Sequence, residues 1–165
     1  MSDESLSIRT ATDNDKPAVW QIIKAVIAGG DTYVFAPDAS EQEMMDYWFT
    51  PDKHNYVAEL NGATVATFWL RPNQPGLGSH VANAAYMVAP SAHGRGIGRR
   101  IAEWSLDEAR RLGFTAMQFN FVVKSNAHAV RLWQKIAFEI IGEIPDAFNH
   151  IEKGPTNAYI MYRKL

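Results

Sequence analysis

The amino-acid sequence predicts a mixed α/β fold in which six or seven strands form a central sheet flanked by about four helices. Two observations carry this prediction. Between residues 80 and 123 an apolar strand, a glycine-rich loop, an amphipathic helix and a second apolar strand follow one another, which is typical of neighbouring parallel strands joined by a right-handed crossover. Strand-like segments around Asn61-Gly62 and near the C-terminus predict antiparallel hairpins.

The first half of the chain predicts two helices and three strands. Acidic residues after Thr12, with Pro17 in the first turn, favour a helix start, and the apolar stripe that follows ends at Gly29-Gly30. Ser40 and Glu43 form the capping box of a second helix. The expected strands cover residues 7–11, 55–60 and 63–70, and the second helix covers residues 40–49.

The second half predicts the centre of the sheet and a closing hairpin. A helix from Ile97 to Leu112 separates the two central strands, and a last helix begins after Ser125, its expected N-cap. We expect His150 to lie in the loop of the closing hairpin, where it would either reach the site or be exposed to solvent; the second interpretation is favoured. The expected ranges are 80–88 and 115–123 for the central strands, 126–136 for the last helix, and 138–144 and 157–162 for the closing hairpin.

Length and composition fit one globular domain over residues 1–165. Hydrophobic residues make up 47% and charged residues 21%, and the net charge of −2 does not indicate a nucleic-acid partner. The absence of cysteine excludes disulfides and thiol catalysis. No segment reaches the roughly 18 apolar residues that span a bilayer, and residues 1–7 lack the core of a signal peptide, so we expect a cytoplasmic protein without a membrane partner.

The glycine-rich loop predicts a diphosphate site. Gly94, Gly96 and Gly98 let the backbone approach a ligand closely, and the free N–H groups of the next helical turn favour an anion. Arg95, Arg99 and Arg100 add positive charge. A P-loop would need Lys followed by Ser or Thr, and a dinucleotide fingerprint would need G-x-G-x-x-G, so neither motif fits. The alternative is a glycine-rich turn that only lets helix and strand pack.

The residues from His93 to Gly98 resemble the coenzyme A loop of the GCN5-related N-acetyltransferase (GNAT) superfamily, which usually reads Q/R-x-x-G-x-G/A after a strand. A second motif downstream follows that family's N-x-x-A-x-x-L-Y-x-K-x-G-F pattern, with Trp133 in place of Tyr and Ala137 in place of Gly. The resemblance covers about residues 6–165. The matching residues of the second motif are Asn126, Ala129, Leu132, Lys135 and Phe138.

The resemblance implies an acetyl-CoA-dependent N-acetyltransferase whose two central parallel strands splay apart. The backbone around Met87 and Val88 would pair with the pantetheine arm, and the Val88 N–H would polarise the thioester carbonyl. Asn126 would hold the pantetheine end, Trp133 would pack along it, and Lys135 would either meet a phosphate or be a solvated helix residue. The remaining residues implied to bind the cofactor are His93, Gly94, Arg95, Gly96, Ile97, Gly98 and Arg99.

Polar residues in the two central strands are the candidates for acceptor binding. Asn83 and Asn120 either bond to each other or to backbone, or line the acceptor pocket; the resemblance favours the second interpretation. The spacing of Asn120 and Asn126 resembles, more weakly, the branch that acetylates proline analogues. Tyr33 and Phe35, after the first helix, would border the same pocket or simply fold onto the core.

The sequence assigns no catalytic base. Trp133 is not a useful general acid, and the strand over residues 80–88 lacks the Glu that many relatives carry there. Its titratable residues are His80 and Tyr86, and a tyrosine with a pKa of about 10 is a poor base at neutral pH. We expect a water relayed through Asn83, Asn120 or Tyr86, and no metal.

These patterns predict acetyl transfer to the amine of a small molecule, an amino acid or an analogue. Two alternatives remain: an acyl-CoA-binding sensor without turnover, suggested by the missing Tyr, and acetylation of a protein amine. Many members of the family dimerise, so the resemblance leaves a homodimer open.

Overall fold

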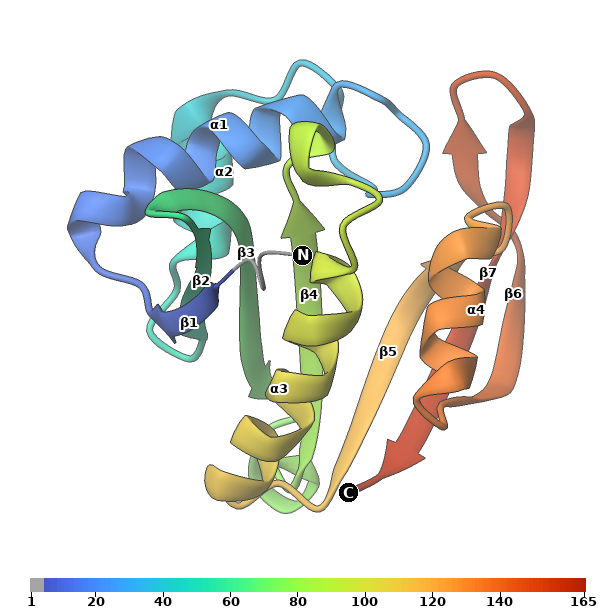
Figure 1. Ribbon diagram of the computed structural model, residues 1–165. Coiled ribbons are helices and arrows are strands. Elements are labelled where there is room, and N and C mark those ends of the chain that lie inside the picture. The colour runs from blue at the N-terminus through green and yellow to red at the C-terminus, as the bar shows by residue number, and fades with distance from the viewer. Residues whose placement is uncertain (1–4) are drawn as a thin grey trace.

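The computed structural model describes residues 5–165, which form a seven-stranded mixed sheet with four α-helices (Figure 1). The strand order is β1-β2-β3-β4-β5-β7-β6, and only β4 and β5 pair in parallel among the described strands. The predicted fold class is thus confirmed. The strands are β1 (Leu6–Thr10), β2 (His54–Leu60), β3 (Ala63–Pro72), β4 (Val81–Val88), β5 (Ala116–Val123), β6 (Glu139–His150) and β7 (Gly154–Lys164), and the helices are α1 (Lys16–Ile27), α2 (Glu41–Trp48), α3 (Ile97–Arg111) and α4 (Ala127–Lys135).

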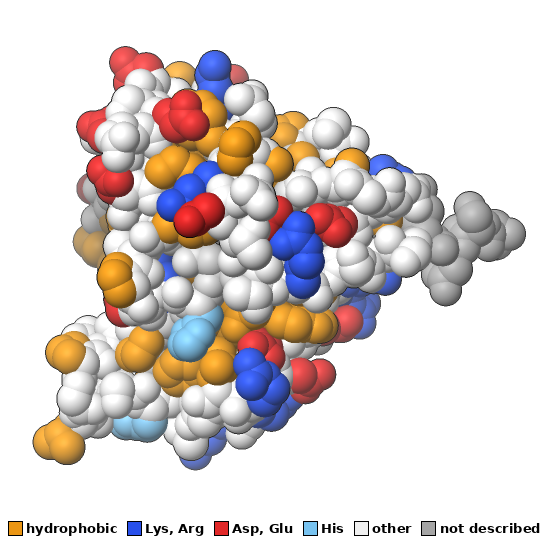
Figure 2. Space-filling view, turned by 90° about the vertical axis from the view of Figure 1, so that its left-hand side faces the viewer, with side chains coloured by type: hydrophobic (Ala, Val, Ile, Leu, Met, Phe, Trp, Pro, Cys, Tyr) orange, Lys and Arg blue, Asp and Glu red, His pale blue; other side chains and the backbone are white. Residues whose placement is uncertain are grey.

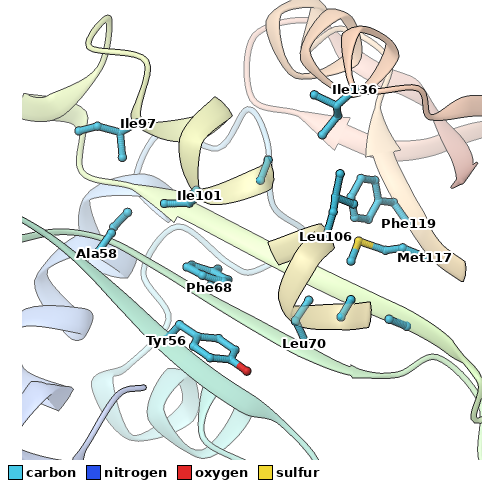
Figure 3. Packing of buried hydrophobic residues seen from close by; sticks show 14 of the residues in the cluster. Tyr56, Ala58, Phe68, Leu70, Ile97, Ile101, Leu106, Met117, Phe119 and Ile136 are labelled. Carbon is cyan, nitrogen blue, oxygen red and sulfur yellow. The ribbon is translucent and has the colours of Figure 1, made fainter. Parts of the chain in front are cut away.

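Helices cover both faces of the sheet. Residues of α3 and the end of α4 pack with the sheet in one apolar cluster, in which Phe68 lies beneath Ile101 and Phe119 lies beside Met117 (Figure 3). On the other face α1 and α2 pack over Trp69 and Met87. Burial of these apolar side chains is the main favourable contribution to folding, and their packing fixes the position of the helices on the sheet.

The parallel pair diverges soon after it begins. β4 and β5 share only the rungs Val81↔Ala116 and Ala82↔Met117, and beyond them the strands separate toward their carboxyl ends (Figure 1). β5 follows β7 instead, with a register irregularity between Phe119 and Val122. The backbone edge of β4 is therefore not paired with β5 along most of its length.

The closing hairpin differs most from the sequence-based expectation. The expected loop over residues 145–156 is largely strand, because β6 and β7 pair from Glu139↔Tyr162 to His150↔Gly154 with irregularities that absorb Pro145. The prediction of an exposed His150 was wrong. Its side chain is buried, and its Nδ1 accepts hydrogen bonds from the N–H groups of Glu152 and Lys153 in the turn.

The helix starts agree with the sequence at one position and differ at another. The Ser40–Glu43 capping box is present, as predicted. The last helix is capped by Asn126 rather than Ser125, since the Asn126 side-chain oxygen accepts the Ala129 N–H at 3.3 Å. Its N-cap residue is thus also a candidate site residue.

The surface carries both signs of charge. On the face shown in Figure 2, acidic and basic side chains are interspersed, as on an ordinary solvated surface. Within residues 5–165 no helix combines the length and the apolar character needed to cross a membrane.

Candidate active site

A cavity of about 340 Å³ lies where β4 and β5 diverge, with the segment between α1 and α2 along its side. It joins two groups of residues that the sequence analysis had considered separately. Asn126 and Trp133, expected at the cofactor, line it together with Asn83 and Asn120, expected at the acceptor. Its other lining residues are Thr32, Tyr33, Val34, Phe35, Tyr47, Trp48, Trp69, Arg71, Ala84, Ala85, Tyr86, Phe119, Phe121, Val122, Val123 and Ala129.

The open edge of β4 presents the backbone groups of Tyr86 and Val88. Hydrogen bonds from Ala89 N–H to Val65 and from Asn73 N–H to Val81 fix the alternation of the β3–β4 ladder. Odd-numbered residues of β4 therefore point their backbone groups at β3, and even-numbered residues point theirs toward the gap. Met87 belongs to the first set, so its backbone faces β3 while its side chain is buried under α1.

Tyr33 crosses the gap to this edge. Its hydroxyl donates to the Tyr86 carbonyl and accepts the Tyr86 N–H at 3.1 Å. Burial raises the pKa of the Tyr33 phenol, so the neutral form that makes both bonds is favoured. At Val88, His93 Nε2 lies 3.2 Å from the carbonyl oxygen.

The glycine-rich loop has the backbone that its sequence predicts. Gly94 and Gly96 adopt positive φ values of 78° and 71°, and a Cβ at either position would meet no atom within 4 Å. Gly96 is the N-cap of α3, and Ile97 anchors the loop in the core with 2% of its surface exposed. The free N–H groups of the first turn of α3 thus follow a loop with open space around its glycines, which suits a phosphate group.

The start of α4 forms the opposite side of the gap. Asn126 Nδ2 donates to Thr32 Oγ1 at 3.1 Å, which ties α4 to the segment after α1. The Trp133 ring lies 4.6 Å from that of Phe119 and 5.2 Å from that of Tyr86, centroid to centroid. Lys135 is exposed in the last turn of α4 and does not line the cavity.

The two asparagines of the acceptor end do not bond to each other. Asn83 Oδ1 accepts the Ala84 N–H at 2.8 Å, whereas Asn120 donates to Asn73 at 2.7 Å and accepts from Gln118 at 3.0 Å. Asn120 is exposed rather than buried, because β5 has left β4 at this level. Both amides line the cavity.

Aromatic rings close the acceptor end. Phe35 stacks on Tyr33 with 6.2 Å between ring centroids and meets Tyr47 edge-on at 4.8 Å. The tip of the β6–β7 hairpin reaches the same segment, where the Ile151 N–H donates to the Gly30 carbonyl at 3.2 Å. These rings form a wall along one side of the cavity.

The titratable residues of β4 supply no base at the cavity. The Tyr86 hydroxyl is 2.6 Å from Ser105 Oγ, beneath α3, and burial raises its pKa. His80 precedes β4 and does not line the cavity. Among the described residues, no group of three or more His, Asp or Glu side chains is placed to hold a metal ion.

Sequence reasoning missed Arg71, Trp69 and Lys53, which meet at the acceptor end. Arg71 and Trp69 line the cavity, and the Lys53 ammonium lies 4.7 Å from the Trp69 ring centroid. A charged residue ending the apolar run ATFWL was a readable signal for Arg71. The position of Lys53, before β2, depends on tertiary contacts.

Comparison with known proteins supports the motif-based resemblance. A model described as the acetyltransferase (GNAT) family matches residues 25–138. N-acetyltransferase aca1 of Schizosaccharomyces pombe is 31% identical over 134 residues, 72% of this chain but only 64% of that protein, so the chain matches less than two thirds of this relative's length.

Solved structures share the fold over almost the entire chain. A GCN5-related N-acetyltransferase from Kribbella flavida is 38% identical, with a TM-score of 0.91 over 97% of this chain and 98% of that one. The structure of yncA from Salmonella typhimurium with its cofactor acetyl-CoA is 20% identical, with a TM-score of 0.81 over 98% and 94% of the two chains, and shows likeness of fold. With the family model matching well over half of its residues, the chain belongs to the GNAT acetyltransferase family.

Proposed function

We propose that this protein transfers an acetyl group from acetyl-CoA directly to the amine of a small molecule, an amino acid or an analogue. The observation that carries the proposal is that one cavity joins the open edge of β4 to an acceptor end lined by aromatic rings and by the amides of Asn83 and Asn120. Membership of the acetyltransferase family supports acetyl-CoA as the donor.

The loop and the open strand edge fit coenzyme A. The N–H groups from Gly94 to Arg99 would hold the diphosphate, with His93 and Arg95 beside them, and open space around Gly94 and Gly96 leaves room for it. Asn126 and Trp133 would contact the pantetheine end. We assign backbone pairing with the pantetheine to Val88 rather than Met87, because the Met87 backbone faces β3.

The chemistry then depends mainly on positioning. The acceptor nitrogen forms a bond to the acetyl carbon, the carbon–sulfur bond breaks, and the thiolate leaves; the ammonium proton passes to water. The Val88 N–H, which points into the gap, would stabilise the negative charge that develops on the carbonyl oxygen. Since a thiol has a pKa of about 8.5, its thiolate departs without an acid in the position of Trp133.

Asn83 and Asn120 would orient the amine and a water that takes its proton. Asn120 is held by Asn73 and Gln118, so its amide has a fixed orientation. Positioning of this kind can lower a barrier by up to about 7–11 kcal/mol. The Tyr86 hydroxyl takes no part in this scheme, because it is bonded to Ser105 on the opposite face of the sheet.

A thiol-release assay tests the proposal. Acetyl-CoA is offered with amino acids, proline analogues, polyamines and aminoglycosides, using the wild type, Asn120→Ala and the control Gln42→Ala, an exposed residue of α2 outside the cavity. We expect turnover on one class of small amine, a loss of at least about tenfold in Asn120→Ala, and no change in the control. Tight acetyl-CoA binding without turnover on any acceptor would favour the sensor or a protein substrate.

A further inference from the structure

The acceptor end of the cavity is rich in hydrogen-bond donors. Arg71 and Asn83 are opposite each other across the β3–β4 ladder, so their side chains leave the same face of the sheet and both line the cavity. Arg71 is the charged member of the lining, and no Asp or Glu is among the described residues that line it. A ligand there meets a cation and a set of N–H groups.

Two of these N–H groups are buried without a partner. Arg71 Nε and Trp69 Nε1 are both inaccessible to solvent and make no hydrogen bond within the described protein. Trp69 is 2% exposed. A buried donor without an acceptor costs on the order of 1–3 kcal/mol, so this end of the cavity has more hydrogen-bond donors than acceptors. A ligand oxygen can reach the guanidinium at its outer part, because 31% of the Arg71 side-chain surface is accessible to solvent.

The charge around Arg71 is incompletely balanced. Its nearest carboxylate is that of Asp52, 3.7 Å from Nη1, which is itself largely exposed and bonded to Thr50. The Lys53 ammonium lies over the rings of Tyr47 and Trp69, 3.7 and 4.7 Å from their centroids. Burial, followed by repulsion from Arg71, lowers the pKa of Lys53 to about 8. Two cations thus face one partly solvated anion, which favours an anionic ligand.

We propose that Arg71, through the solvent-accessible part of its guanidinium, binds the carboxylate of an amino-acid acceptor. This inference rests on the proposed function and names the feature that selects among small amines. A guanidinium matches the planar shape of a carboxylate and can donate two parallel hydrogen bonds to it. Amines without a carboxylate would give the Arg71 charge no such partner.

The same contact would help the amine to react. In a free amino acid the carboxylate stabilises the neighbouring ammonium, and an Arg71 partner offsets that negative charge, so the pKa of the bound amine falls. More of the bound acceptor is then neutral at pH 7. The neutral amine, which is the nucleophile, can thus form in a cavity whose described lining has no carboxylate that could act as a base.

The test compares each acceptor with its carboxamide. Proline and prolinamide, and methionine and methioninamide, are assayed with the wild type, Arg71→Gln, Arg71→Lys and the control Arg110→Gln, an exposed residue of α3 outside the cavity. We expect Arg71→Gln to lose about 10- to 100-fold in kcat/KM on the acids, mainly through KM, and to change by less than twofold on the amides. Arg71→Lys should fall between, and the KM for acetyl-CoA should stay unchanged in every variant.

An equal loss on acids and amides, or a wild type that prefers the amides, would overturn the role of Arg71. If no amine is turned over, the proposed function fails, and binding alone then decides the inference. Tryptophan fluorescence would follow titration with proline and prolinamide, since Trp69 lies in the cavity wall. Binding of the acid alone, lost in Arg71→Gln, supports the carboxylate site; equal binding of both, or binding of neither, refutes it.

Discussion

Replacing Gly96 by Ala should lower either the stability of the protein or its affinity for coenzyme A, through the backbone alone. Gly96 has φ 71° and ψ 11°, a left-handed conformation that costs a non-glycine residue about 1–2 kcal/mol. No atom lies within 4 Å of the position that its Cβ would take, so a steric clash adds nothing. If the loop keeps its shape, the cost appears in the free energy of unfolding; if the loop relaxes, the cost appears in binding.

The sum of the two losses is therefore fixed by the structure at about 1–2 kcal/mol, which corresponds to about 5- to 30-fold in Kd if binding bears it all. Urea unfolding measures the loss in the free energy of unfolding, and calorimetric titration with coenzyme A measures the loss in binding free energy. Gly113→Ala is the matched control, because Gly113 also has a positive φ, 92°, with no atom within 4 Å of its Cβ position, and lies beyond the other end of α3. An equal loss of coenzyme A affinity in both variants, or no effect of Gly96→Ala on either quantity, would refute the reasoning.

Three further predictions concern stability. Asp15, whose carboxylate receives two 2.8 Å hydrogen bonds from Arg9, has its pKa lowered from 3.8 to about 2, mainly by those bonds. The stabilisation by ionised Asp15 is therefore complete above pH 4 and is lost as the pH falls through about 2. Asp15→Asn should lower the free energy of unfolding, measured in urea, by about 2 kcal/mol at pH 7 and should make that free energy depend less on pH below 4. The same acid dependence in wild type and variant would contradict this. Tyr33→Phe leaves the Tyr86 N–H and carbonyl without their partner and should cost about 1–3 kcal/mol, which an unaltered urea midpoint would exclude. Acetyl-CoA at 100 times its Kd should add about 2.7 kcal/mol to the free energy of unfolding, measured as a rise in Tm. Where Gly96→Ala weakens binding, the rise should be smaller in that variant at the same ligand concentration. A wild-type Tm that does not respond to acetyl-CoA would count against the cofactor site.

Features of local backbone chemistry could be predicted from the sequence. The alternating glycines before Ile97 fix the loop and the start of α3, because few other residues adopt positive φ at low cost. The Ser40–Glu43 box determined where α2 begins, and Asn61-Gly62 determined the β2–β3 turn. Each of these signals lies within a few residues of the structure that it specifies.

The shape of the candidate site was decided by contacts between distant segments. The short β4–β5 pairing opens the cavity, and Tyr33 reaches Tyr86 across a separation of 53 residues. Pairing with β7 extended β6 to His150, where the local sequence had indicated an exposed loop. Likewise Arg71 reads locally as a strand end, and it becomes a candidate carboxylate ligand only because β3 pairs with β4 and α2 covers the same face. The sequence by itself determined the glycine-rich loop and the family, since both depend on residues close in the chain. Burial and charge pairing at the acceptor end depend on packing, which only the tertiary structure decides.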